Sequence, residues 1–158
     1  MKLIALLVAL VQIGITPINC KREVPFENTT VEQRAEYAGL TVEEFVLFSS
    51  VVEAESNRCT DDTTGRRHIA LVIINRVESD IFPNTYTEVL CQSGQFSTVR
   101  NGASVTNRTD LSDLAVLEAI EWNEDPTSPE ILFFNCRGFF SGRQPYGDGA
   151  IGGNYFSF

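Results

Sequence analysis

Histidine and basic residues are scarce in this sequence. The 158-residue chain has one histidine, His68, and 12 lysines and arginines against 21 aspartates and glutamates, so its net charge is −9. Proteins that bind nucleic acid neutralise phosphates with basic side chains, so this charge argues against nucleic acid as the main partner. It does not exclude a polysaccharide, whose recognition rests on hydrogen bonds and stacking.

Closely spaced metal ligands are also lacking. Cys20, Cys59, Cys91 and Cys136 lie far apart with no C-x-x-C pair, and one histidine cannot supply a metal-dependent amidase. We therefore expect no metal and no cofactor. Cys59 and His68 are the one close Cys–His pair, but no third residue is evident that would orient the histidine of a cysteine peptidase. We interpret His68 as a surface residue in the first turn of a helix.

The N-terminus has the features of a secretory signal peptide. Lys2 precedes an apolar run, residues 3–15, which is too short for a comfortable membrane span. The region before Cys20 has no clear cleavage site, so an uncleaved N-terminal anchor is the first alternative and lipidation at Cys20 a weaker one. We expect export to the periplasm, cell wall or medium, with membrane contact through this segment alone. In an exported protein one disulfide is expected, most simply among Cys59, Cys91 and Cys136, with further connectivities open if Cys20 is retained.

Length and composition indicate one folded domain. A chain of this length with 43% hydrophobic residues can bury a single sizeable core. We assign residues 1–20 to the signal peptide or anchor, 21–39 to a polar linker with one helical turn over 31–37, and 40–158 to the domain, which we expect to be a monomer.

The pattern within this domain predicts a mainly α protein of the α+β class. Thr41 with Glu44, and Thr85 with Glu88, are capping-box signatures, and Asp110 is a candidate N-cap. The predicted helices cover residues 42–56, 66–78, 86–92 and 111–122. A short buried strand is predicted over 131–134, and the tail from 137 to 153, which has six glycines, is predicted to be irregular.

The first of these helices is apolar on nearly every face, yet it carries Glu53 and Glu55 near its C-terminal end. Glu53 lies in line with Val42 and Val46, whereas Glu55 shares a direction with Glu44 on an edge that we expect to be solvated. Burial and the partial negative charge of a helix C-terminus both disfavour an ionised carboxylate. This predicts a raised pKa for Glu53, as a general acid requires. The alternative is a partly exposed residue in a fraying last turn.

Carboxylate chemistry is what remains after these exclusions. Glycoside cleavage normally uses two carboxylates, but Glu55, Asp61, Asp62 and Glu78 are more simply solvated charges. A mechanism with Glu53 alone fits best, in which it protonates the leaving glycosidic oxygen and then acts as base. Aromatic residues of the later segments offer walls on which sugars stack, with core packing as the alternative for each. They are Phe96, Phe134, Tyr146, Tyr155 and Phe156.

Six short segments, in order, resemble the SleB-type cell wall hydrolase family, which includes spore-cortex-lytic enzymes. No single segment is diagnostic, but their occurrence in this order along nearly the whole mature chain is a strong indication of the family. They are VVEA at 51–54, IALVIINRV at 69–77, FPNT at 82–85 with QFS at 95–97, LFF at 132–134 and GGNYF at 152–156. The resemblance implies a lysozyme-like catalytic domain with a small β element that cleaves the glycan strands of peptidoglycan.

The resemblance also implies a reaction and a site. The reaction is that of a lytic transglycosylase, which forms 1,6-anhydro-muramic ends without water, with Glu53 as general acid and base. We expect substrate contacts from Gln95, Phe96, Ser97, Phe134, Asn154 and Tyr155. The segment between Glu53 and Gly65 is longer than is usual in the family, so Glu55 is the reserve acid. A hydrolytic muramidase and an inactive glycan-binding or scaffolding member are the alternatives.

Overall fold

The computed structural model describes residues 26–56, 63–96, 99 and 108–158. In this part of the chain, five helices precede a three-stranded sheet. The helices are α1 Val31–Ala38, α2 Val42–Glu55, α3 Thr64–Glu78, α4 Tyr86–Cys91 and α5 Asp110–Asn123, and the strands are β1 Phe133–Asn135, β2 Pro145–Ile151 and β3 Asn154–Ser157. The prediction of a mainly α fold with a small β element is confirmed.

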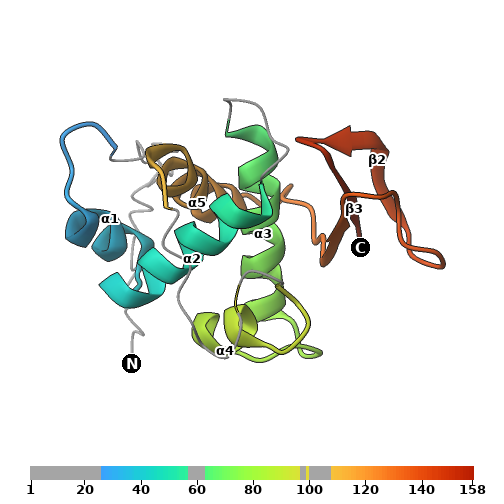
Figure 1. The fold of residues 1–158 in the computed structure, drawn as a ribbon, viewed down its shortest axis with the longest axis horizontal. Coiled ribbons are helices and arrows are strands. Elements are labelled where there is room, and N and C mark those ends of the chain that lie inside the picture. Colours follow the sequence, from blue (N-terminus) through green and yellow to red (C-terminus); the bar gives the residue numbers. More distant parts are fainter. Residues whose placement is uncertain (1–25, 57–62, 97–98, 100–107) are drawn as a thin grey trace, which may run out of the picture.

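Helix α3 runs through the middle of the molecule and joins its two parts (Figure 1). On one side it packs against α5 and α2, with α1 outside them, and α4 lies against α2 and α3. On the other side it contacts strands β1 and β2 of the sheet. Residues Ile69 to Ile74 of α3 are therefore buried by neighbours on every side.

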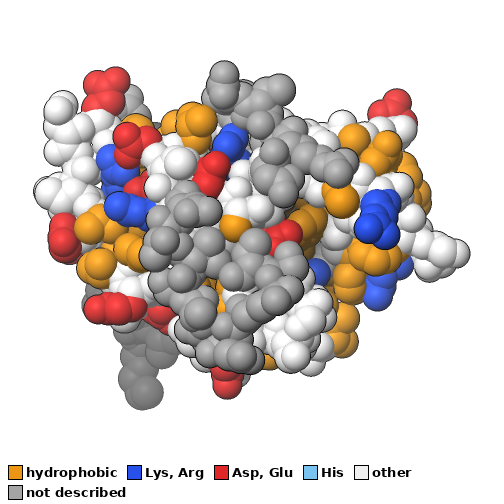
Figure 2. All heavy atoms as spheres, in the orientation of Figure 1, with side chains coloured by type: hydrophobic (Ala, Val, Ile, Leu, Met, Phe, Trp, Pro, Cys, Tyr) orange, Lys and Arg blue, Asp and Glu red, His pale blue; other side chains and the backbone are white. Residues whose placement is uncertain are grey.

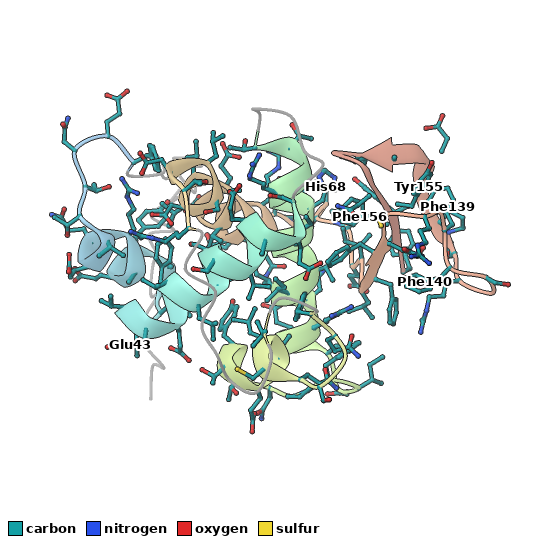
Figure 3. All side chains as sticks on the ribbon, viewed as in Figure 1. Glu43, His68, Phe139, Phe140, Tyr155 and Phe156 are labelled. Carbon is teal, nitrogen blue, oxygen red and sulfur yellow. The ribbon has the colours of Figure 1, made fainter. Side chains whose placement is uncertain are left out.

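Helix α2 forms as its sequence predicts. The Thr41 side chain accepts a hydrogen bond from the Glu44 backbone N–H at 3.1 Å, as part of a capping box. Exposed Glu43 in the same turn places a negative charge near the positive end of the helix dipole, which stabilises the start of α2 (Figure 3). Phe45, Phe48, Val51 and Val52 are fully buried. The last turn of α2 therefore emerges from a closely packed core, which fixes where its glutamates lie.

The polar end of α3 anchors the chain that leads into the sheet. Asn75 Nδ2 donates to the carbonyls of Pro129 at 3.0 Å and Ile131 at 2.9 Å. Next to it, Arg76 Nε donates to the carbonyl of Leu132 at 2.9 Å. These bonds satisfy backbone acceptors that no strand partner reaches, and they hold β1 against α3.

The C-terminal tail differs from the prediction, because it is not irregular throughout. Strands β2 and β3 pair antiparallel, and β3 also pairs with β1 in the order β1-β3-β2. Gly152 and Gly153 connect β2 to β3 with φ of 55° and 81°, the left-handed values that a two-residue hairpin turn requires. Two of the six glycines that suggested an irregular tail therefore form the turn of a hairpin.

Smaller boundaries also shift. Thr109, not Asp110, is the N-cap of α5, and its side chain accepts from the Ser112 N–H at 3.2 Å. The strand predicted at 131–134 begins at Phe133. Ile131 is buried before it, and its carbonyl accepts a hydrogen bond from the Asn75 side chain and not from a strand. The helical turn predicted over 31–37 is α1.

Helix α1 packs against the domain. Its Ala35 is buried, and the helix contacts α2 and α5. The chain division at residue 40 stays a prediction.

Cys91 and Cys136 are both free and exposed, so the predicted disulfide does not involve them. Cys20, Cys59 and the proposed signal peptide lie outside the described residues. Within the described ranges, none of the helices has the length and apolar character that crossing a membrane requires.

Candidate active site

The two glutamates at the end of α2 lie in different environments, and Glu53 is part of a closed cluster. Arg66 of α3 donates to both of its carboxylate oxygens, from Nε to Oε2 and from Nη2 to Oε1, each at 3.0 Å. Thr109 Oγ1, at the start of α5, donates to Oε2 at 2.6 Å. The side chains of Glu53 and Arg66 are only 17% and 9% exposed. The Glu53 cluster, defined as Glu53, Arg66 and Thr109, thus ties three helices together.

The raised pKa predicted for Glu53 is wrong. Burial, the largest single influence, acts to raise the pKa of its carboxyl. The hydrogen bonds from Arg66 and Thr109 and the positive charge of Arg66 outweigh burial together, so the pKa lies below its ordinary 4.5. Glu53 is therefore ionised at neutral pH, and its lone pairs are engaged by protein donors.

Glu55 faces a cavity instead. It lies two residues further along α2, about 200° round the helix from Glu53. The cavity has a volume of about 540 Å³ and lies between the end of α2, α3, the loop after α4 and the sheet. It is lined by Glu55, Arg76, Gly94, Gln95, Phe133, Phe134, Asn135, Cys136, Phe140, Arg143 and Asn154. Glu55 is the one carboxylate among these lining residues, and it is half-buried.

The cavity brings together four of the residues predicted from sequence, namely Glu55, Gln95, Phe134 and Asn154. They come from α2, the loop after α4, β1 and β3. Asn154 is buried at 4% exposure, and Phe134 packs over the ring of Phe156, with centroids 6.0 Å apart. A polar and aromatic hollow of this volume, with one acid among its described lining residues, is suited to a sugar chain.

Two other predicted contacts, Phe96 and Tyr155, are not in this lining. Phe96 is a core residue at 2% exposure, with its ring 6.5 Å from that of Phe134. Tyr155 stacks edge-on against Phe139, with centroids 5.1 Å apart, away from α3 (Figure 3). Asn154 and Tyr155 cannot both face the cavity because successive strand residues point to opposite faces. Ser97 lies outside the described residues.

His68 is buried, so its interpretation as a surface residue is wrong. Its ring lies 5.0 Å from that of Trp122 and 5.2 Å from that of Phe156, toward which it points in Figure 3. Nδ1 lies 2.8 Å from the Thr64 carbonyl, so in the neutral ring this nitrogen carries the proton and donates. Burial lowers the pKa of His68. Its position within an aromatic cluster indicates a packing role.

Two arginines of the cavity were not singled out from sequence. Arg76 stands in the IALVIINRV segment, whose apolar pattern drew attention to the helix and not to its last cation. Arg143 stands in the glycine-rich tail, where no periodic signal exists. Among the described residues, no group of three or more His, Cys, Asp and Glu side chains is placed to hold a metal ion.

The family described as Cell Wall Hydrolase matches residues 60–152, more than half of the chain. The chain belongs to the cell wall hydrolase family. The match includes Arg76, Gln95, Phe134 and Arg143 of the cavity, and it starts after the end of α2, so Glu53 and Glu55 precede it. The resemblance drawn from the sequence is confirmed at the level of the family.

Individual relatives agree with this membership. The chain is 33% identical over 98 residues to a spore cortex-lytic enzyme of Bacillus cereus, a stretch that covers 61% of this chain and 36% of that protein. It is 35% identical over 72 residues to the spore cortex-lytic enzymes of Oceanobacillus iheyensis and Bacillus subtilis, covering 45% of this chain and 25% and 23% of theirs. The aligned part of this cell wall hydrolase thus spans about a third or less of these relatives. No solved structure matches the chain.

Proposed function

We propose that this cell wall hydrolase is exported and cleaves the glycan strands of peptidoglycan, with Glu55 as general acid and base. The observation that carries the proposal is the position of Glu55 as the one carboxylate among the described residues that line the 540 Å³ cavity. The family membership supports the same substrate.

The geometry favours Glu55 over Glu53 for the catalytic role. A general acid must reach the glycosidic oxygen and give up a proton to it. The Glu53 carboxylate is ionised, so it has no proton to give to the glycosidic oxygen. It also accepts three hydrogen bonds from Arg66 and Thr109, which occupy the oxygens that would have to approach the substrate. Glu55 lies at the cavity wall, as the last residue of α2. Under this proposal Glu53 positions α2 and does not touch the substrate.

A single carboxylate supports a lytic transglycosylase reaction. Glu55 protonates the oxygen of the glycosidic bond after N-acetylmuramic acid, and the C1–O bond breaks. The carboxylate then takes the proton of the 6-hydroxyl of the same sugar, whose oxygen closes on C1. The product is a 1,6-anhydro end, no water is consumed, and Glu55 regains its proton. A water-using reaction would normally require a second carboxylate at the cavity wall.

Two isosteric variants test the assignment: Glu55→Gln and Glu53→Gln. Each is incubated with peptidoglycan sacculi, soluble products are identified by mass spectrometry, and folding is followed by thermal unfolding. For Glu55→Gln we expect an unchanged Tm and a loss of product formation of at least about 100-fold, the contribution of a general acid–base group. For Glu53→Gln we expect a lower Tm and activity that follows the folded fraction.

The opposite pattern, a folded but inactive Glu53→Gln and an active Glu55→Gln, would give the catalytic role to Glu53. Anhydro-muramic ends from the wild type support the transglycosylase reaction, and reducing ends would replace it with hydrolysis. Sacculus binding without any product would mark the chain as a glycan-binding member of the family.

A further inference from the structure

Helix α3 carries two buried arginines, Arg66 at 7% and Arg76 at 5% exposure, and only the first is neutralised. Arg76 forms no ion pair with any residue that the structure describes. Its Nε donates to the Leu132 carbonyl, but its Nη1 is buried without a hydrogen-bond partner. A buried charged donor without a partner is costly, so Arg76 needs an explanation that Arg66 does not.

The surroundings of Arg76 hold its charge without neutralising it. Its guanidinium carbon lies 5.0 Å from the ring centroid of Phe82, 5.5 Å from that of Phe96 and 5.8 Å from that of Phe133. These ring faces attract the cation but offer no acceptor for Nη1. Burial, and to a smaller extent the charge of Arg143, lower the pKa of Arg76 to about 10, so it remains a cation at neutral pH.

A second cation lies against the same ring. The guanidinium carbon of Arg143 is 3.2 Å from the centroid of Phe133. Arg143 is exposed and likewise has no ion pair among the described residues. Both arginines line the cavity that Glu55 lines, and neither pairs with Glu55. Two like charges held together with no described counter-ion repel each other, and an anion between them would remove that cost.

The local charge is opposite to that of the whole protein. The chain carries a net charge of −9, yet the ionisable lining of the cavity includes two arginines and one glutamate. On the face that Figure 2 presents, the charged side chains among the hydrophobic ones over the sheet are mainly basic, whereas over the helical part acidic and basic side chains are mixed. Such a concentration of positive charge in a hollow attracts anionic ligands.

We propose that Arg76 and Arg143 form an anion subsite that binds a carboxylate carried by the muramic acid residue of the substrate. The proposal rests on the proposed function, which brings a peptidoglycan strand into this cavity. Muramic acid carries a lactyl group, whose carboxylate is free in peptide-free strands, and the peptide stem attached there brings carboxylates of its own. Guanidinium groups pair strongly with carboxylates through charge-assisted hydrogen bonds. The subsite would therefore distinguish muramic acid-containing strands from neutral glycans.

A purely structural role explains less. The bond from Nε to Leu132 and the packing of the phenylalanine rings account for the stem of Arg76 and for one of its donors. They leave Nη1 without a partner, and they do not explain why Arg143 lies beside an existing cation.

Three glycan preparations test the subsite. They are strands freed of peptide, which carry the lactyl carboxylate, the same strands with that carboxylate converted to a methylamide, and strands with intact stems. Binding to the full chain carrying Glu55→Gln, which prevents cleavage, is measured by titration calorimetry. We expect the methylamide strands to bind about tenfold more weakly than the carboxylate strands, the loss of one charge-assisted hydrogen bond. Tight binding of peptide-free strands identifies the lactyl carboxylate as the anion, and tight binding of stem-bearing strands alone identifies a stem carboxylate.

Arginine variants in the same background localise the effect. Arg143→Gln should remove the preference for carboxylate, and Arg137→Gln, an exposed arginine of the same segment outside the cavity lining, should keep it. Arg76→Met provides a second variant, with its folding checked by thermal unfolding. Equal affinity for all three preparations, or a preference that survives both Arg143→Gln and Arg76→Met, would overturn the subsite.

The subsite and the proposed function can fail separately. Wild-type protein that cleaves all three preparations equally well would keep the function and remove the subsite. Carboxylate-dependent binding without any cleavage by the wild type would keep the subsite and remove the function.

Discussion

The Glu53 cluster and the cavity beside it use the same residue types in opposite ways. In the cluster, Arg66 and Thr109 engage both oxygens of Glu53. In the cavity, Arg76 and Arg143 lie near each other without a carboxylate partner among the described residues, and Glu55 lines the same cavity. The paired charges of the cluster hold the fold, whereas the two arginines of the cavity, which have no carboxylate partner among the described residues, are available to an anionic ligand.

Helix geometry keeps the two regions apart although they share two helices. Glu53 and Glu55 differ by two residues, or about 200° on α2, so one faces α3 and α5 and the other faces the cavity. Arg66 and Arg76 are ten residues apart on α3, a rise of about 15 Å. A small change in position along a helix therefore separates a structural ion pair from a candidate catalytic acid.

The largest stability effect is expected from breaking the Glu53 cluster at its arginine. Arg66→Met keeps much of the side-chain volume but leaves the mostly buried Glu53 carboxylate without its cation. Removing one partner of such a pair costs roughly 3 kcal/mol, which lowers Tm by about 6–12 °C for a chain of this size. Thermal and urea unfolding measure the change. A loss below about 0.5 kcal/mol would show that the pair behaves as a surface salt bridge and does not hold the helices.

The pH dependence of stability provides a second, smaller effect in the same cluster. The folded pKa of Glu53 lies below its ordinary 4.5, so between the two values the unfolded chain binds the proton more readily. The stability that Glu53 contributes is therefore present above about pH 4.5 and lost as the pH falls through the folded pKa. Urea unfolding of wild type and Glu53→Gln from pH 7 to pH 3 should show a difference that shrinks in this window.

The titration of His68 does not disturb that comparison. Its folded pKa is lowered below 6.5, so its contribution is lost in a higher window, as the pH falls below about 6.5. Because both proteins retain His68, its contribution cancels in their difference. A difference that stays constant down to pH 3 would contradict a depressed pKa for Glu53.

The sequence predicted best what is decided locally. Thr41 with Glu44 and Thr85 with Glu88 are three residues apart, so the helix starts follow from neighbouring side chains alone. The partner of Glu53 could not be found in this way, because Arg66 approaches only when α2 packs against α3. The direction of the pKa shift of Glu53 depends on this contact, so the sequence alone predicted it wrongly.

The cavity was predicted in part for a related reason. Gln95, Phe134 and Asn154 were singled out from their segments, but Tyr155 was included because a motif does not show which strand residues share a face. Strand β2 has no regular alternation of apolar residues, so the hairpin that supports Asn154 gave no periodic signal beyond Gly152 and Gly153. Arg143 reaches Phe133 from a segment with no pattern at all.

The smallest stability effect is expected at the other arginine of α3, and it tests the comparison most sharply. Arg76→Met removes one hydrogen bond to Leu132 and the attraction of three rings, but it also removes a buried charge that no described residue neutralises. These terms oppose each other, so the free energy of unfolding should change by no more than about 1 kcal/mol. The same substitution at Arg66 is the matched control, since both side chains are buried on one helix. Equal losses of unfolding free energy at the two positions would mean that Arg76 stabilises the fold as much as Arg66 does. The unpaired Nη1 of Arg76 would then not indicate a ligand site.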